Sequence, residues 1–382
     1  MSKVILTPAQ VRAIWLQAQG LDQTHSFGSG KRAVVKAIKH LGYVQIDTIH
    51  VIERSHHHIL YSRIPDYKRS YLHQAQTKDK TVFEYWTHAL AYIATDDFKY
   101  FMNDMKRRKD NPSSWYSDVT TSDIKKVVAK IKKEGPISIR DVNDEELIEK
   151  NHPWASKKPS KRHLQAAFNG GDLVISERVG MLKKYQLTNR HFGWSKCPKA
   201  ARPSEVSEYH INRALQSQGV VSLDSICYME KAAHKKEILK CLDVKVRKGA
   251  LLPVEVEGVQ KHQFWIDGKL LESEIPDVSH LTHILSPFDP LVIQRKRFNM
   301  FFGYDHRFEA YLPKEKRKYG YFTLPVIIGD QAVAVLDLKT DRQNRQLLIQ
   351  QWSWLAKHKS KSNKQLIEAE LNRFEKFQLA AD

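Results

Sequence analysis

The sequence has 382 residues, enough for two to four domains, and its 41% hydrophobic content is that of a globular protein. Lysine and arginine number 62 against 43 aspartate and glutamate residues, so the net charge is +19. This excess predicts a polyanionic partner, with nucleic acid the first candidate and an anionic membrane the second.

Membrane insertion and secretion are not expected. No apolar run approaches the roughly 20 residues that cross a bilayer, and Met1 to Gln10 lacks the apolar core of a signal peptide. Cys197, Cys227 and Cys241 are odd in number and widely spaced, so they predict neither a disulfide framework nor a thiolate metal site. We therefore expect a protein of a reducing cytosol.

The chain opens with two predicted helices. Thr7 to Gln19 has helical periodicity, with Thr7 as its N-cap. A second amphipathic run, Arg32 to Leu41, ends at Gly42, a typical C-terminal helix glycine. A short strand follows, and a third helix is predicted from Thr48 to Leu60, with Asp47 placed to cap it.

This order of helix, glycine, short strand and helix occurs three times. The three copies start at these glycines: Gly42, Gly135 and Gly219. Such a unit is how a winged-helix (helix-turn-helix) module begins. At the fourth position the later copies carry Ser138 and Ser222, whereas the first carries Gln45, which indicates where any chemistry lies.

Both later copies are followed by a helix and a hairpin pattern. Ser160 to Phe168 precedes two β-patterned runs joined at Gly180, and Ala232 to Leu242 precedes two runs that turn around Gly258. A helix followed by such a hairpin is the recognition helix and wing of a winged helix.

From Thr282 the pattern changes to short β-like runs, including Phe308 to Leu312, which predict a small antiparallel barrel or sheet. The predicted fold class is α+β, with three tandem winged-helix subdomains and a C-terminal antiparallel β-barrel. The expected segments are 1–110, 122–192 and 204–280 for the three modules, 281–355 for the barrel and 361–380 for a terminal helix.

Basic residues recur at equivalent places in these modules and around the β region. The candidates for DNA contact are Lys157, Lys158, Lys161, Arg162, Lys235, Lys236, Arg295, Lys296, Arg297, Lys316, Arg317 and Lys318. Each cluster alone could be an ordinary solvated face. Their recurrence favours phosphate neutralisation, which gives affinity but no sequence readout.

Gln45 and Asp47 form the sharpest candidate pair. Residues i and i+2 of a strand project from the same face, so an amide and a carboxylate would lie side by side. A carboxylate can take a proton from water and stabilise a nearby cation, while an amide orients the same water. The alternative is that Asp47 only caps the next helix, as Asp224 would in the third copy, and spacing alone favours the cap.

Two other features predict no cofactor site. His56, His57 and His58 would point roughly 100° apart on a helix and cannot share one metal ion, so one core and two surface histidines are expected. The run Gly28 to Arg32 matches neither a P-loop nor a dinucleotide fingerprint.

Four motifs, in order along the chain, resemble the AlkZ/YcaQ family of winged-helix DNA glycosylases. They are Gly42-Tyr43-Val44-Gln45-Ile46-Asp47-Thr48-Ile49, Phe83-Glu84-Tyr85-Trp86-Thr87-His88-Ala89, Ser286-Pro287-Phe288-Asp289-Pro290-Leu291 and Lys316-Arg317-Lys318-Tyr319-Gly320-Tyr321. The resemblance implies three winged-helix subdomains and a β-barrel that cradle duplex DNA. Gln45-Ile46-Asp47 is similar to the aspartate-containing YcaQ branch, which makes Gln45 and Asp47 the implied catalytic pair.

The resemblance further implies excision of N-alkylated purines, notably N7-alkylguanine, and unhooking of interstrand crosslinks in base excision repair. The second glutamine of the other branch is absent, so that branch's substrate preference is not carried over. No lysine nucleophile occurs in the motif, which predicts a monofunctional hydrolase. The resemblance implies double-stranded DNA as the substrate, no cofactor and a place on the nucleoid of the bacterial cytoplasm. A three-module body that wraps its substrate would work as a monomer.

Two other functions remain open from the residues alone: a non-catalytic winged-helix DNA-binding regulator and an RNA-binding accessory protein. Glu84 and His88, within the aromatic motif, either support the site or pack the first module, and packing is the favoured interpretation.

Overall fold

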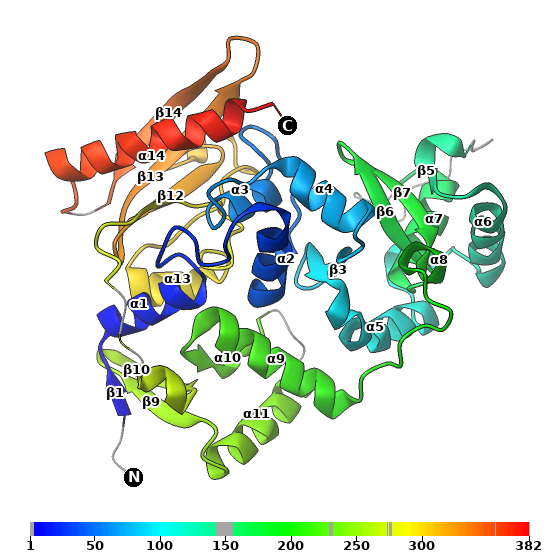
Figure 1. The fold of residues 1–382 in the computed structure, drawn as a ribbon, viewed down its shortest axis with the longest axis horizontal. Helices are drawn as coiled ribbons and strands as arrows, with labels where there is room; N and C mark the ends of the chain where they lie inside the picture. Colours follow the sequence, from blue (N-terminus) through cyan, green and yellow to red (C-terminus); the bar gives the residue numbers. More distant parts are fainter. Residues whose placement is uncertain are drawn as a thin grey trace. The chain divides into compact units, whose positions relative to one another are not determined.

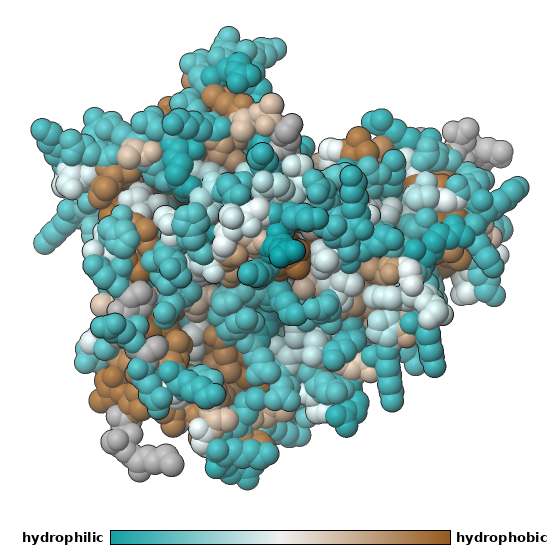
Figure 2. Space-filling view, viewed as in Figure 1, coloured by the Kyte–Doolittle hydropathy of each residue, from teal (hydrophilic) through white to brown (hydrophobic). Residues whose placement is uncertain are grey.

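The computed structural model describes residues 4–142, 156–228, 232–272, 274, 277–355 and 357–381. The chain divides into two compact units (Figure 1). The first contains Met1–Arg69, Thr87–Leu90 and Ser207–Asp382, and the second contains Ser70–Trp86 and Ala91–Val206. Hydrophilic residues predominate on the face seen in Figure 2, in keeping with the high content of charged residues. No helix in the described ranges is long and apolar enough to cross a membrane.

The first unit begins with two helices that the sequence predicted. Its N-terminal elements are β1 (Val4–Leu6), α1 (Pro8–Ala18), α2 (Gly30–Leu41), β2 (Val44–Gln45) and α3 (Ser55–Tyr61). Thr7 caps α1 through a reciprocal pair of hydrogen bonds with Gln10. Gly42 ends α2 with a φ of 79°, and a Cβ at this position would collide with the Arg213 side chain.

In the second and third copies of the repeat, a helical turn follows the serine at the fourth motif position, and that serine caps it. Ser138 forms a capping box with Asp141 at the 3₁₀ turn η3 (Ile139–Asp141), and Ser222 forms one with Ser225 at α10 (Leu223–Ile226). In these copies the fourth motif position is therefore an N-cap.

The first copy departs from this pattern. Gln45 occupies the capping position, residues 46–54 contain neither helix nor strand, and α3 starts only at Ser55. The helix predicted from Thr48 to Leu60 is therefore wrong in its first half. Asp47 does not cap a helix.

Another part of the first unit is a sheet that includes the hairpin of the third copy. The elements from 203 to 271 are α9 (Pro203–Gln218), β8 (Val221–Ser222), α10, α11 (Ala232–Arg247), β9 (Leu252–Val256), β10 (Val259–Ile266) and α12 (Gly268–Leu271). The strand order is β1-β9-β10-β8, and β1 runs parallel to β9. Trp15 of α1 and Phe264 of β10 belong to one buried apolar core beneath this sheet.

The C-terminal region is an open sheet. Its elements are β11 (Thr282–Ile284), α13 (Arg295–Phe302), the 3₁₀ turn η4 (Lys314–Lys316), β12 (Thr323–Ile328), β13 (Gln331–Asp341), β14 (Gln346–Trp354) and α14 (Lys361–Leu379). The antiparallel order β11-β12-β13-β14 leaves β11 and β14 as edges, so the predicted closed barrel is not found among the described residues. The strand predicted at Phe308 to Leu312 is a loop. Helix α14 packs on the sheet (Figure 1) through buried Ile367 and Phe374.

The second unit contains the hairpin of the second copy. Its elements are α4 (Arg69–Thr77), β3 (Val82–Trp86), β4 (Leu90–Ala94), η1 (Thr95–Asp97), α5 (Phe98–Asp110), η2 (Ser114–Tyr116), α6 (Thr121–Glu134), β5 (Ile137–Ser138), η3, α7 (Pro159–Asn169), β6 (Leu173–Val179), β7 (Leu182–Leu187) and α8 (Thr188–Phe192). The sheet order is β5-β7-β6. Glu84 is fully buried and pairs with Arg178 at 2.5 Å, so this residue of the aromatic motif packs its unit, as expected.

The three consecutive histidines differ from expectation. His56 and His58 are 3% and 0% exposed, and His57 bonds to the Tyr67 hydroxyl at 2.6 Å. Two of the three histidines are thus core residues, where one was expected, because the short helix α3 is packed on the sides that carry His56 and His58.

Candidate active site

Gln45 is held at the end of β2 by the turn of the β3–β4 hairpin. Its side chain is 7% exposed, and its Oε1 accepts a hydrogen bond from His88 Nε2 at 2.9 Å. His88 lies in that turn. Next to it, the Ile46 amide donates a backbone hydrogen bond to the Leu90 carbonyl at 2.8 Å. The aromatic motif therefore supplies, through His88, a hydrogen-bond partner for the candidate residue Gln45. Of the two interpretations left open for His88, packing was the favoured one.

His88 is a neutral donor. Burial, reinforced by the charge of Arg213, lowers its pKa to about 4. Its ring stands edge-on to Tyr43 and Tyr228, with centroids 5.0 and 5.4 Å away. In the Nε2–H tautomer His88 fixes the carbonyl end of the Gln45 amide, which leaves the NH₂ group to bind a water or a sugar oxygen.

We predict that His88→Phe slows excision by about tenfold by freeing Gln45, because a phenyl ring keeps the packing and loses only the N–H. The loss should fall on the single-turnover rate and not on DNA affinity. Tyr228→Phe is the matched control, since its hydroxyl bonds the Ile293 carbonyl at 3.0 Å and not Gln45. A His88→Phe protein with the wild-type rate would remove this residue from the site.

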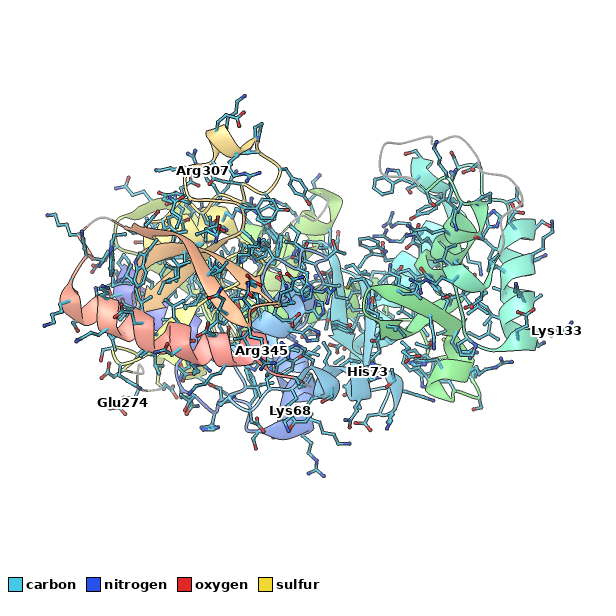
Figure 3. The ribbon with its side chains drawn as sticks, turned by 90° about the horizontal axis from the view of Figure 1, so that it is seen from above. Lys68, His73, Lys133, Glu274, Arg307 and Arg345 are labelled. Carbon is cyan, nitrogen blue, oxygen red and sulfur yellow. The ribbon has the colours of Figure 1, made fainter. Side chains whose placement is uncertain are left out.

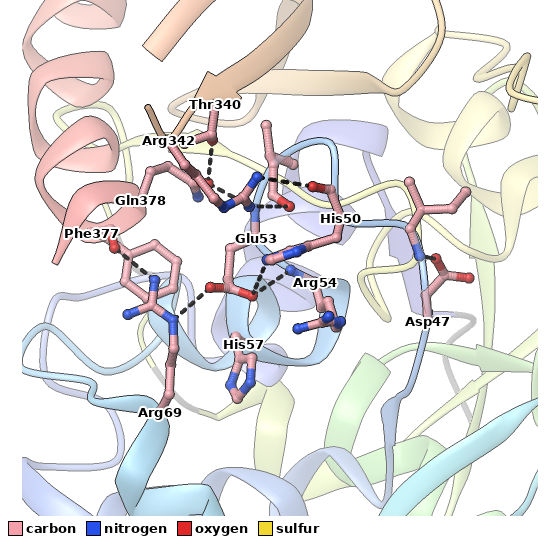
Figure 4. A network of polar contacts seen from close by, with 12 residues as sticks. Asp47, His50, Glu53, Arg54, His57, Arg69, Thr340, Arg342, Phe377 and Gln378 are labelled. Carbon is pink, nitrogen blue, oxygen red and sulfur yellow. Dashed lines mark hydrogen bonds and ion pairs between the residues drawn. The ribbon is translucent and has the colours of Figure 1, made fainter. Parts of the chain in front are cut away.

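Asp47 is a half-buried carboxylate on an irregular loop. Its Oδ1 accepts a hydrogen bond from the Ile49 amide at 2.8 Å (Figure 4), and no residue in the described ranges bonds to Oδ2. Burial raises the pKa of Asp47, and the hydrogen bond from Ile49 opposes this rise. The side chain thus keeps one oxygen available for a reacting group.

The loop around Asp47, residues 46–54, is fixed by the C-terminal sheet and helix (Figure 4). Thr340 of β13 donates its amide to the Val51 carbonyl at 2.9 Å, and Arg342 donates to the His50 carbonyl at 3.2 Å. The Glu53 amide donates to Gln378 Oε1 of α14 at 2.7 Å. These long-range bonds replace those of a helix and preorganise the carboxylate.

The pH dependence of excision should follow Asp47. Burial raises the pKa of Asp47, so this carboxylate is protonated at a higher pH than an ordinary carboxyl group. We therefore expect the rate, as pH decreases, to begin falling above the ordinary carboxyl range. His88 stays neutral until pH approaches 4 and so contributes nothing above this value. Single-turnover rates on preformed complexes from pH 4 to 8 would check this, and a rate that stays flat down to pH 4 would contradict it.

The predicted DNA-binding residues differ in accessibility. Exposed side chains are Lys157, Lys158, Lys161, Lys236, Lys296, Lys316 and Lys318, and partly exposed ones are Lys235, Arg295 and Arg317. Arg162 and Arg297 are buried. Arg297 lies 4.4 Å over the Trp15 ring and donates to the Val220 carbonyl at 2.5 Å, while burial lowers its pKa to about 9. Arg297 therefore serves the core.

A loop held by backbone hydrogen bonds to Glu309 presents the last basic cluster. Residues 307–321 project from the first unit, with Arg307 at the start of the loop (Figure 3). The buried Glu309 carboxylate accepts the backbone amides of Lys318, Tyr319 and Gly320 at 3.0, 2.8 and 3.3 Å. A Cβ at Gly320, whose φ is 130°, would collide with Asp337. The loop exposes Tyr311 by 76%, a contact candidate that the charge pattern did not reveal.

Comparison with known proteins agrees with this architecture. A profile of the family described as "DNA glycosylase AlkZ-like" matches residues 38–377. DNA glycosylase AlkZ of Streptomyces sahachiroi has a similar mixed α+β fold, with a TM-score of 0.64 at 16% sequence identity over 98% of this chain and 96% of that chain. Because the family match extends over most of the sequence, the chain belongs to the AlkZ-like family of DNA glycosylases.

Proposed function

We propose that this DNA glycosylase is monofunctional and hydrolyses the N-glycosidic bond of N-alkylated purines, foremost N7-alkylguanine, and that it unhooks interstrand crosslinks in base excision repair. The observation that carries the proposal is the altered first repeat. Gln45 replaces an N-cap serine, and Asp47 stands on a fixed, non-helical loop with one oxygen unpaired in the described structure.

The chemistry suits a carboxylate and an amide. An N7-alkylated guanine is cationic, so the electron pair of the breaking C1′–N9 bond neutralises the ring and the base leaves without a strong acid. Asp47 stabilises the oxocarbenium-like sugar and takes the proton of the attacking water, whose oxygen bonds to C1′. The Gln45 amide, fixed by His88, orients this water.

The product is expected to be an abasic site. Residues 42–54 contain no lysine, so the loop offers no amine for a Schiff base and strand cleavage. A bulky crosslinked base cannot enter a closed pocket in the usual way. We therefore propose an open site at which the lesion is reached within the duplex.

The proposed DNA surface uses the accessible basic residues and omits Arg297. We also propose that the three repeats act as winged helices within the segments predicted from sequence, that the protein belongs to the YcaQ branch, and that it works as a monomer on the nucleoid of the bacterial cytoplasm. The net charge supports the DNA surface, the repeats support the winged helices, and the run Gln45-Ile46-Asp47 supports the branch.

The basic loop gives a salt-dependence prediction. Lys316→Gln with Lys318→Gln should weaken duplex binding and reduce the slope of log K against log salt by about 2, since each phosphate contact contributes about 0.9. Lys359→Gln with Lys361→Gln removes the same charge from an exposed stretch outside the predicted contacts, and should change neither quantity. Equal effects of the two pairs, measured by fluorescence anisotropy, would refute a specific role for the loop.

Incubation with duplex DNA that carries 7-methylguanine tests the proposed activity. Strand breaks that occur only after alkali are the expected result. Breaks without alkali would indicate a lyase, and intact strands after alkali would indicate that 7-methylguanine is not a substrate.

A further inference from the structure

The second unit contains a cavity of about 240 Å³ walled by aromatic rings. Trp86, Trp115 and Tyr116 contribute to its lining. The Trp86 ring is fixed by a hydrogen bond from its Nε1 to Asn169 Oδ1 at 2.8 Å, and Trp115 is 38% exposed. The cavity has room for one planar heteroaromatic ring system, and exposed aromatic faces are what an unstacked base binds.

The same cavity is basic. Arg108, Lys161 and Arg162 line it, and its described lining includes no carboxylate. Such a wall favours a ligand with negative charge or several acceptor oxygens, which a nucleotide offers in its phosphate and in its base carbonyls.

Arg162 has a buried donor group that such a ligand could bind. Its guanidinium is 2% exposed, donates to the Trp115 carbonyl at 2.9 Å and pairs with Asp118. Its Nε–H, however, is buried without an acceptor in the described part of the chain. A buried donor that is left unpaired is unfavourable, and an oxygen of a bound ligand would satisfy it.

Helix α7 brings the polar groups together. Gln165 follows Lys161 by four residues and Arg162 by three, so the three side chains lie on neighbouring parts of the helix surface. All three line the cavity, and Gln165 adds an amide to the two cations. An amide beside a stacked ring can pair with the edge of a base.

We propose that this cavity binds one unstacked nucleotide of the DNA substrate, with the base against Trp115 and its acceptor oxygens toward Arg162 and Lys161. The proposal rests on DNA being the substrate, and it adds a nucleotide-binding position built from the second unit alone, without Gln45 or Asp47. Excision of an alkylated purine leaves its partner base in the duplex without a pair, which gives the position a natural occupant.

The probe is a duplex with a single unpaired 2-aminopurine, compared with the same duplex fully paired. Full-length protein should bind the bulged duplex about tenfold more tightly and quench the 2-aminopurine fluorescence by stacking. Trp115→Ala should lose both effects, and Trp115→Phe should keep most of them. Tyr100→Ala, a partly exposed aromatic of α5 outside the cavity, should behave as wild type.

Lys161→Ala provides a second variant whose exposed side chain is not needed for folding. It should reduce the preference for the bulged duplex several-fold. The proposal would be overturned if the wild-type protein did not prefer the bulged duplex to the paired one. It would also be overturned if both Trp115→Ala and Lys161→Ala kept this preference.

Excision of 7-methylguanine by the same proteins separates this inference from the proposed function. A Trp115-dependent preference without excision would reject the substrate and keep the nucleotide position. Excision without any preference for the bulged duplex would reject the nucleotide position alone.

Discussion

Asp47→Asn is expected to slow the single-turnover excision of 7-methylguanine by about a thousandfold or more while duplex affinity stays within about twofold. An asparagine keeps the shape and can still accept the Ile49 amide, but it can neither balance the developing charge on the sugar nor take a proton from water. Rapid-quench measurement of abasic-site formation would give the rate.

Folding should not suffer in this variant. Because burial raises the pKa of Asp47, the ionised form is less favourable in the folded state than in the unfolded chain at neutral pH, so a neutral asparagine should hold or slightly raise the melting temperature. Asp224→Asn, at the same motif position in the third copy, is the matched control. Its carboxylate is exposed and pairs with Lys235 at 2.7 Å, so the rate should be that of the wild type.

Asp289→Ala is expected to lower the free energy of unfolding by about 3–5 kcal/mol. Asp289 forms a two-pronged ion pair with Arg63, with N–O distances of 2.7 and 2.9 Å, and both side chains are 0% exposed. The Arg63 guanidinium also donates to the Gln19 carbonyl at 2.8 Å. Removing the carboxylate leaves a buried, uncompensated cation, which urea denaturation would detect.

Asp330→Ala is the control for this loss. Asp330 pairs with Arg12 at 2.7 Å but is 27% exposed, so its removal should cost about 1 kcal/mol or less. Equal losses from the two variants would show that burial does not set the strength of the Arg63 pair. The comparison bears on the motif from Ser286 to Leu291, which contains Asp289. The buried ion pair with Arg63 indicates that Asp289 stabilises the fold and does not act in catalysis.

The elements that local signals define could be predicted from the sequence. Helix α14, Lys361–Leu379, starts at the predicted residue and ends one residue before the predicted end at 380, because one face is apolar and Ser360 caps its start. Helix α1 and the hairpin of β6 and β7 also agree, since a capping residue and a turn glycine mark them. Gln45 and Asp47 were selected by the motif and the resemblance together, and their catalytic role stays a prediction.

The features that depend on distant partners could not be predicted. The helical pattern after Asp47 is overridden because Thr340, Arg342 and Gln378, about 300 residues away in sequence, bind that loop's backbone. The link between His88 and Gln45 likewise joins segments 43 residues apart. No local pattern encodes either contact.

Burial of charge was also invisible in the sequence. Arg162 and Arg297 lie in basic clusters, yet both are buried: Arg162 pairs with the exposed Asp118, and Arg297 stacks on Trp15. A count of cations cannot separate an arginine that packs from one that meets phosphate, because both occur in the same helical runs.

The central proposal is that the first repeat carries the active site, with Gln45 at the position where the other two copies have a capping serine. The most direct test is the single-turnover excision of 7-methylguanine by Gln45→Ser and Ser222→Gln, which exchange the two residues between copies. Gln45→Ser should lose about a hundredfold or more in rate, whereas Ser222→Gln should cost about 1 kcal/mol of stability and keep the wild-type rate per folded molecule. Wild-type excision by Gln45→Ser would contradict the account.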